Sequence, residues 1–172
     1  MKRFVHKREI SMRTFELGDH SILVEGSLID RRYPPKQSKV PKKSELIHHM
    51  VIRWKVKGPG MLIEESEATM PHHPNEECPV ILPVIRNLEG LRIAPGFTLK
   101  VKKVIGGIKG CAHLTSLVLA MAEEAIQGYW AAYVEERRRG IREEDVKNLI
   151  NTCHLWREGG PIVKGLRERG EA

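Results

Sequence analysis

Apolar and polar residues alternate along the first part of the chain, which is the period of a β-strand with one buried face. The predicted strands cover residues 4–16, 21–32, 46–57 and 61–69. The third is the clearest, because Met50 and Trp54 share one phase and Arg53 takes the other. Turns and a Pro- and Lys-rich loop at 33–44 separate the strands, so we expect an antiparallel meander with one solvated face.

The second part of the chain follows a different pattern. The largely apolar run from Cys78 to Leu88 predicts a helix, and the apolar, β-branched run at 97–105 predicts a further strand. Apolar residues at steps of three and four predict a long helix over 111–139, followed by a short helix over 142–150. The charged, glycine-containing chain from residue 151 onwards is typical of a partly ordered tail.

These elements predict an α+β fold, with an antiparallel four- to five-stranded sheet covered on one face by a long helix and shorter helices. The length of 172 residues suits one domain. We place that domain at residues 1–155 and expect a basic, flexible C-terminal tail at 156–172. The exposed edge strand of such a sheet needs cover, and a homodimer is one way to supply it.

The chain is basic, with 29 Lys and Arg residues against 22 Asp and Glu and a net charge of +7. Part of the excess is local: Lys36, Lys39, Lys42 and Lys43 in the loop, Arg137, Arg138 and Arg139 at the end of the long helix, and Lys164, Arg167 and Arg169 in the tail. Cations at a helix C-terminus complement its dipole. No base-stacking aromatic residue interleaves with these charges, which argues against a nucleic-acid partner.

Cysteine usage and hydropathy indicate the compartment. Cys78, Cys111 and Cys153 are odd in number and widely spaced, which favours reduced thiols over a disulfide framework. No apolar run reaches the roughly 18–20 residues of a membrane span. The basic N-terminus lacks the apolar core of a signal peptide. We therefore expect a cytoplasmic protein with no membrane partner.

Asp30 and His48 interrupt the apolar faces of two neighbouring strands. Asp30 is in phase with Leu28, and His48 lies between Leu46 and Met50. Buried polar groups need partners, and a hairpin around the 33–44 loop makes the two residues cross-strand neighbours. His48 is then a general base or ligand oriented by the carboxylate. The alternative is a structural hydrogen bond that closes the hairpin.

A glycine-rich turn leads directly into the long helix and carries Cys111 and His113 at its start. Unpaired N–H groups and the positive end of the dipole meet there, which favours a thiolate or an oxyanion. Cys111 is a candidate nucleophile, metal ligand or sulfur acceptor, with His113 beside it. The alternative is that Cys111 is a small buried residue and that His113 caps the helix.

Two further charged residues are candidates for the same site. Glu67 shares the phase of Ile63, so it can point a carboxylate inward. Arg32 can hold an anionic group of a substrate. The chain has no Cys-x-x-Cys or His-Glu-x-x-His spacing, and we predict no cofactor. A transition metal or iron–sulfur cluster needs ligands assembled from distant segments: Cys78, Cys111, His113 and Cys153.

An ordered set of motifs resembles a bacterial family catalogued as domain of unknown function 2889, over about residues 5–155. The set consists of Asp30-Arg31-Arg32, Ile47-His48-His49-Met50, Glu67-Ala68-Thr69-Met70, Pro74, Cys78, Leu88-Glu89-Gly90-Leu91, Pro95-Gly96-Phe97 and Gly110-Cys111-Ala112-His113-Leu114. In the last motif the family usually has threonine where this chain has Ala112, so a role for that hydroxyl is absent. The resemblance implies Asp30, His48, Glu67, Cys78, Cys111 and His113 as the functional positions.

The first hypothesis for function is a small enzyme that acts on a small oxygenated molecule by proton transfer, elimination or retro-aldol C–C cleavage. Asp30, His48, Glu67, Cys111 and His113 form its catalytic set, and Arg32 binds the substrate. The second hypothesis is a non-enzymatic carrier or scaffold for a metal, sulfur or an iron–sulfur cluster. The third is a nucleic-acid-binding module.

Overall fold

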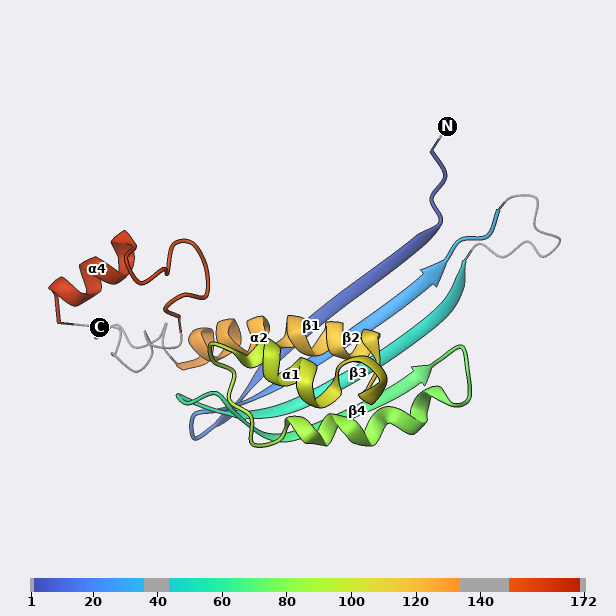
Figure 1. The fold of residues 1–172 in the computed structure, drawn as a ribbon, viewed down its shortest axis with the longest axis horizontal. Coiled ribbons are helices and arrows are strands. Elements are labelled where there is room, and N and C mark those ends of the chain that lie inside the picture. Colours follow the sequence, from blue (N-terminus) through green and yellow to red (C-terminus); the bar gives the residue numbers. More distant parts are fainter. Residues whose placement is uncertain (1, 36–43, 134–148, 171–172) are drawn as a thin grey trace.

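Four long strands form one antiparallel sheet in a computed structural model that describes residues 2–35, 44–133 and 149–170. The strands are β1 (His6–Gly18), β2 (Ser21–Arg32), β3 (Glu45–Lys57) and β4 (Leu62–His72). They pair in sequence order, β1-β2-β3-β4, as a meander. Figure 1 shows the sheet with helices on one face, so the predicted α+β architecture is confirmed.

The helical segments follow the strands. They comprise the 3₁₀ helix η1 (Cys78–Leu88), α1 (Phe97–Ile105), the short 3₁₀ turn η2 (Gly107–Lys109), α2 (Ala112–Tyr133) and α4 (Pro161–Glu168). Pro83 lies inside η1, where a proline removes a helical N–H donor. In the tail, α4 buries Val163 and Leu166, so part of the segment expected to be flexible forms a helix with a buried face.

The sheet buries one face because its alternate residues are apolar. Val24 and Leu28 of β2 and Ile52 and Trp54 of β3 have no exposed surface or almost none. The indole N–H of Trp54 donates to the buried Ser66 hydroxyl at 3.0 Å, which satisfies its one polar atom inside the core. The alternation read from the sequence is therefore the pattern that fixes which face the helices cover.

The predicted strand at 97–105 is wrong, because this segment is helix α1. Phe97, Val101 and Ile105 are buried at helical steps of four, whereas Leu99 is 73 % exposed. The sheet therefore has four strands and not five. The apolar residues fit both periods over so short a run, and the left-handed Gly96 (φ 87°) places the chain at the start of a helix instead.

Several sequence predictions lie outside the described residues. They concern the loop lysines Lys36, Lys39, Lys42 and Lys43, the end of the long helix beyond Tyr133 with Arg137, Arg138 and Arg139, and most of the short helix at 142–150. In the described part of the chain, no helix combines the length and apolar character that crossing a membrane requires.

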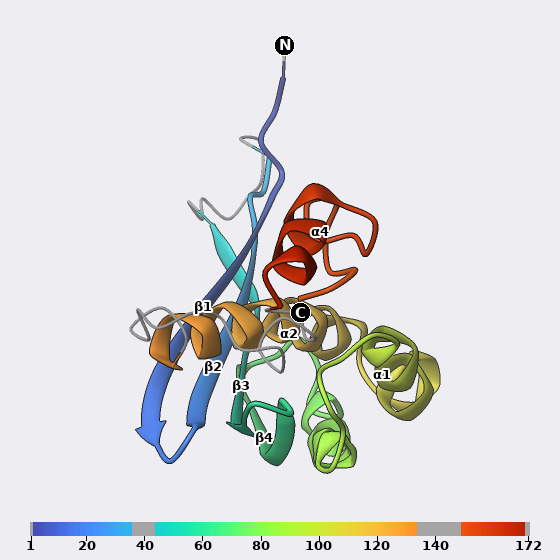
Figure 2. The same cartoon turned by 90° about the vertical axis from the view of Figure 1, so that its left-hand side faces the viewer.

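Helix α2 runs across the inner faces of β1 and β2, as the end-on view shows (Figure 2). It approaches β1 closely at Gly128, where an added Cβ would lie 2.4 Å from Cγ2 and Oγ1 of Thr14. The Thr14 hydroxyl donates to Glu124 of the same helix at 2.8 Å. A residue without a side chain is therefore needed at position 128 to seat the helix on the edge strand.

We expect Gly128→Ala to lower the free energy of unfolding by about 1–3 kcal/mol, because overpacking outweighs the gain of about 1 kcal/mol in helix propensity. Thr14 is short, so it cannot swing away from the new methyl group. Urea denaturation measures the change. The matched control is Gln127→Ala at the exposed neighbouring position, which should leave stability unchanged or slightly higher. Equal stability of Gly128→Ala and the wild type would contradict this packing.

Candidate active site

Asp30 is a buried carboxylate near the end of β2, with 1 % of its surface exposed. The Arg8 side chain on β1 donates a hydrogen bond to each carboxylate oxygen, with Nε 2.8 Å from Oδ1 and Nη2 2.7 Å from Oδ2. A buried charge is tolerated only when it is paired and hydrogen-bonded, and a guanidinium fork supplies both conditions. The pair fixes Asp30 in one orientation at the junction of the first two strands.

His48 of β3 lies directly opposite Asp30 in the sheet register, as the hairpin argument predicts. Its Nδ1 is 3.1 Å from Oδ2 of Asp30. The side chain of His48 is 15 % exposed. In the described residues no hydrogen bond involves its Nε2. In a neutral imidazole, an ionised carboxylate at Nδ1 favours the tautomer with the proton on Nδ1, which leaves the lone pair on Nε2.

His113 reaches the same carboxylate from the first turn of α2. Its Nε2 is 3.5 Å from Oδ2 of Asp30, and its ring packs against that of His48 with centroids 4.0 Å apart and planes inclined by 35°. Its other nitrogen, Nδ1, lies 3.6 Å from Sγ of Cys111. Cys111 and His113, at the start of the helix, therefore both lie at the end of the sheet.

The turn before α2 depends on a close approach of two backbone segments. A Cβ at Gly110 would lie 2.0 Å from the carbonyl oxygen of Ile105, so no larger residue fits without moving the chain. The Thr115 hydroxyl donates to that same carbonyl at 3.2 Å. These contacts connect the end of α1 to the first turn of α2 and set where Cys111 and His113 stand.

The charges in the cluster perturb one another in a consistent direction. The Arg8 hydrogen bonds lower the pKa of Asp30 below its ordinary value of 3.8, with smaller contributions from His48 and His113. Burial lowers the pKa of His113 below 6.5, and the charges of His48 and Arg8 add to this effect against the opposing influence of Asp30. Asp30 is therefore a carboxylate and His113 a neutral imidazole at neutral pH.

The structure adds two β1 residues that the sequence reasoning did not assign to the site, Arg8 and His6. Nε2 of His6 is 3.6 Å from Oδ1 of Asp30. The signal that points to them was available, since both share the inward phase of Ile10 and Met12 on the first strand. A strand that presents two cations inward is expected to face a buried anion on its neighbour.

Glu67 does not join the cluster. A bulge in β4 places both Glu64 and Glu65 on the exposed side and shifts the phase, so that Ser66 is buried and Glu67 points outward. The Glu67 side chain is 66 % exposed and pairs with Arg53 at 3.5 Å. The expectation of an inward carboxylate at Glu67 is therefore wrong. Arg32 is exposed near the end of β2, two residues beyond Asp30.

The three cysteines are free thiols, with Cys78 and Cys111 partly buried and Cys153 exposed. In the described residues, one group of three or more potential metal ligands has its ligand atoms within 4.8 Å of one another, and it consists of Asp30, His48 and His113. The cysteines are not part of that group. Of the four metal ligands considered from the sequence, only His113 belongs to it.

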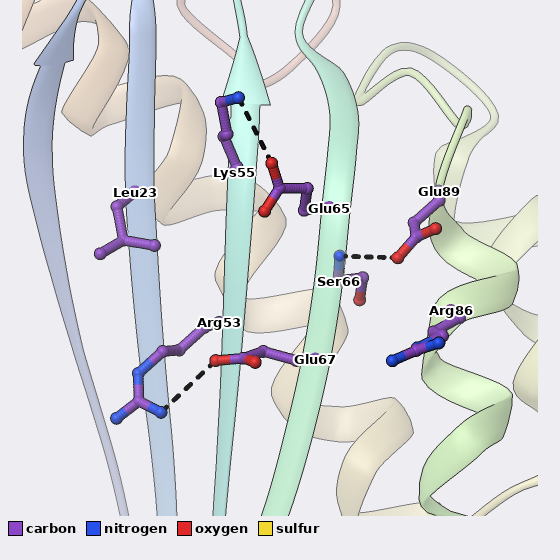
Figure 3. A pocket seen from close by; sticks show the side chains of 8 residues that line it. All are labelled: Leu23, Arg53, Lys55, Glu65, Ser66, Glu67, Arg86 and Glu89. Carbon is purple, nitrogen blue, oxygen red and sulfur yellow. Dashed lines mark hydrogen bonds and ion pairs between the residues drawn. The ribbon is translucent and has the colours of Figure 1, made fainter.

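A separate hollow of about 270 Å³ lies on the opposite face of the sheet, between β3, β4 and η1 (Figure 3). The polar groups that line it pair largely with one another: Arg53 with Glu67, Lys55 with Glu65, and the Ser66 N–H with Glu89. The hollow holds no histidine or cysteine. The chemistry-bearing side chains are therefore at the end of the sheet and not in this hollow.

A family described as "Protein of unknown function (DUF2889)" matches residues 6–127, which is more than half of the chain. This protein belongs to the DUF2889 family. The matched range includes Arg8, Asp30, His48, Cys111 and His113. No curated protein matches, and no solved structure matches either.

In this DUF2889 protein we expect Asp30→Asn to lower the free energy of unfolding at pH 7 by about 2–3 kcal/mol, because Arg8 loses its buried counter-charge. The difference between wild type and variant should persist down to about pH 4. It should then shrink as pH falls below 3.8 and through the lower folded pKa of Asp30, because the wild type also loses the charge there.

Urea denaturation across this pH range measures the effect. The matched control is Glu65→Gln, which removes an exposed carboxylate paired with Lys55 at 3.3 Å and should change stability by less than about 0.5 kcal/mol. A difference for Asp30→Asn as small as that of the control would contradict a structural role for the Arg8–Asp30 pair.

Proposed function

We propose that this protein is an enzyme that transfers a proton at the Asp30–His48–His113 cluster. The observation that carries the proposal is the buried Asp30 carboxylate hydrogen-bonded to Nδ1 of His48 at 3.1 Å. That contact orients the imidazole and holds its tautomer, and it leaves Nε2 of His48 to accept a proton. It is the relation that orients a catalytic histidine in many acid–base sites.

The neighbours of His48 support a role in stabilising developing charge. His113 is neutral at neutral pH, and the centroid of its ring lies 4.0 Å from that of His48. The first turn of α2 adds the positive end of a helix dipole. A substrate oxygen that becomes negative when a neighbouring C–H or O–H loses its proton is stabilised in such surroundings. This supports lyase-type chemistry: elimination or retro-aldol C–C cleavage of a small oxygenated molecule.

Three expectations from the sequence belong to this proposal. Arg32 is our candidate for holding an anionic group of the substrate, because Arg8 is already committed to Asp30. Cys111 takes part through His113, whose Nδ1 its sulfur approaches at 3.6 Å. A cytoplasmic setting fits the three free cysteines.

The test is proton exchange in D₂O with a panel of small hydroxy and oxo acids, followed by ¹H NMR. The wild type should exchange or cleave at least one panel member. His48→Asn should lose about 100-fold or more in rate, because asparagine keeps a donor near Nδ1 for Asp30 and removes the base at Nε2.

The matched control is His49→Asn, which alters the neighbouring histidine on the same strand, where alternate side chains point to the other face. It should keep the wild-type rate. Circular dichroism confirms that both variants are folded. Exchange that survives His48→Asn, or no reaction with any panel member, would contradict the proposed base.

A second candidate is a divalent metal site formed by Asp30, His48 and His113. The observation that favours it is spacing: the two histidine nitrogens lie 3.1 and 3.5 Å from Oδ2 of Asp30. Ligands about 2.0–2.1 Å from a tetrahedral zinc ion are separated by roughly 3.3 Å. Two imidazoles and one carboxylate are also a common ligand set for catalytic metals.

Metal analysis of protein purified without chelator separates the two candidates. The metal candidate expects about one zinc or iron per chain, and His113→Gln should bind the ion at least tenfold more weakly. Cys78→Ser, outside the three-residue group, should keep the metal and serves as the control. Protein that contains no metal and binds neither Zn²⁺ nor Co²⁺ in titrations would eliminate this candidate.

A further inference from the structure

The two edges of the sheet differ in how their backbone groups are paired. At the β4 edge, the chain at 90–93 returns and pairs with the strand: the Ile63 N–H donates to Leu91 and the Ile93 N–H donates to Met61, both at 2.9 Å. At the other edge, β1 pairs only with β2 among the strands of the described residues. Its 13 residues therefore present a long row of backbone donors and acceptors for another strand.

Exposed apolar side chains concentrate on this same strand. Ile10 is 38 % exposed, Phe15 46 % and Leu17 51 %. Inward charges and bulges commonly guard natural edge strands, and β1 has them only near its ends: His6 and Arg8 at its start and a bulge between Glu16 and Gly18. Its inward residues between these ends, Ile10, Met12 and Thr14, are uncharged. A long edge with exposed apolar residues usually has a partner. The edge therefore resembles an interface, and its own sequence indicates what fits it.

We propose that two copies of this chain join through β1, antiparallel about Ser11, so that two four-stranded sheets form one of eight strands. In this register residue 9 of one copy lies opposite residue 13 of the other. Glu9 therefore faces Arg13 twice across the two-fold axis, and Ile10 faces Met12. Opposed residues in an antiparallel pair point to the same side, so both helix layers lie on one side of the joint sheet.

The alternative register centred on Met12 places Glu9 opposite Phe15 and Ser11 opposite Arg13, with no opposite charges on the outer face. Its opposite-charge pair is Arg8 with Glu16 on the inner face, where Arg8 already binds both oxygens of Asp30. In the Ser11 register His6 also faces Glu16. Both charged side chains are accessible, since Arg13 is 73 % exposed and Glu9 is 48 % exposed. Within its own chain Arg13 pairs with Glu25 at 2.9 Å and Glu9 pairs with Lys7 at 2.7 Å, so the partner chain would add to or replace these exposed contacts.

The proposed pairing places the candidate site beside the seam. Arg8, which holds Asp30, and His6 both lie on β1, and Arg8 would stand opposite Thr14 of the second copy. Association fixes the strand that carries the guanidinium and covers one side of the cluster. The inference stands on the geometry of β1 and does not depend on whether His48 is a base or a metal ligand.

Charge exchange between two variants tests both the dimer and its register. Wild type at about 50 μM should be a dimer in sedimentation velocity. Glu9→Arg brings two arginine pairs together and Arg13→Glu brings two glutamate pairs together, so each variant alone should dimerise at least tenfold more weakly. An equimolar mixture should form a heterodimer, because the arginine introduced in one chain then meets the glutamate introduced in the other. Native mass spectrometry with one variant tagged identifies it.

Two further proteins sharpen the result. The double variant Glu9→Arg/Arg13→Glu should dimerise with itself like the wild type, whereas Lys100→Glu, an equal change of charge on exposed α1, should leave the dimer unchanged. Circular dichroism establishes that each single variant is folded. A monomeric wild type would overturn the proposal. So would single variants that dimerise like the wild type, or a mixture that yields no heterodimer.

Discussion

The buried charge of Asp30 is the constraint on which this end of the molecule depends. A carboxylate with 1 % of its surface exposed must have its charge compensated by fixed partners, since water cannot do so. Those partners come from three elements: Arg8 from β1, His48 from β3 and His113 from α2. The carboxylate thereby ties together two hairpins and the start of the long helix. The same compensation that permits its burial assembles a group of side chains capable of chemistry.

The sequence predicts more of this arrangement than single-residue motifs suggest. Residue phase together with the hairpin around the 33–44 loop was sufficient to pair Asp30 with His48, because the register of an antiparallel hairpin links local pattern to a long-range contact. The same reasoning misplaced Glu67, since a bulge at Glu64 and Glu65 reverses the phase and leaves no signature in the alternation itself. The facing direction of residues along a strand can be predicted from the sequence only up to the first β-bulge.

Two other features show where pattern alone is insufficient. Residues 97–105 satisfy both a two-residue and a four-residue period. The structure follows the four-residue period, with the left-handed Gly96 before the helix and Phe97, Val101 and Ile105 buried. The arrival of His113 at Asp30 depends on the close turn at Gly110 and on how α2 crosses the sheet through its contacts with β1. The helical pattern does not show which residues Gly110 and Gly128 approach. The glycine turn indicated a helix start with chemistry. It could not indicate which strand that start would meet.

Arg8 bears most directly on what the cluster does. Two of its nitrogens donate hydrogen bonds to the two oxygens of Asp30 at 2.7 and 2.8 Å, so a fixed cation already compensates the charge of the carboxylate. A divalent ion bound to the same oxygen would face that cation through a poorly solvated region, and this repulsion opposes metal binding. His48 that has accepted a proton carries one positive charge against the two of a divalent ion, so the same repulsion is weaker for the base. The guanidinium fork therefore supports the proposed proton transfer more than the proposed metal site.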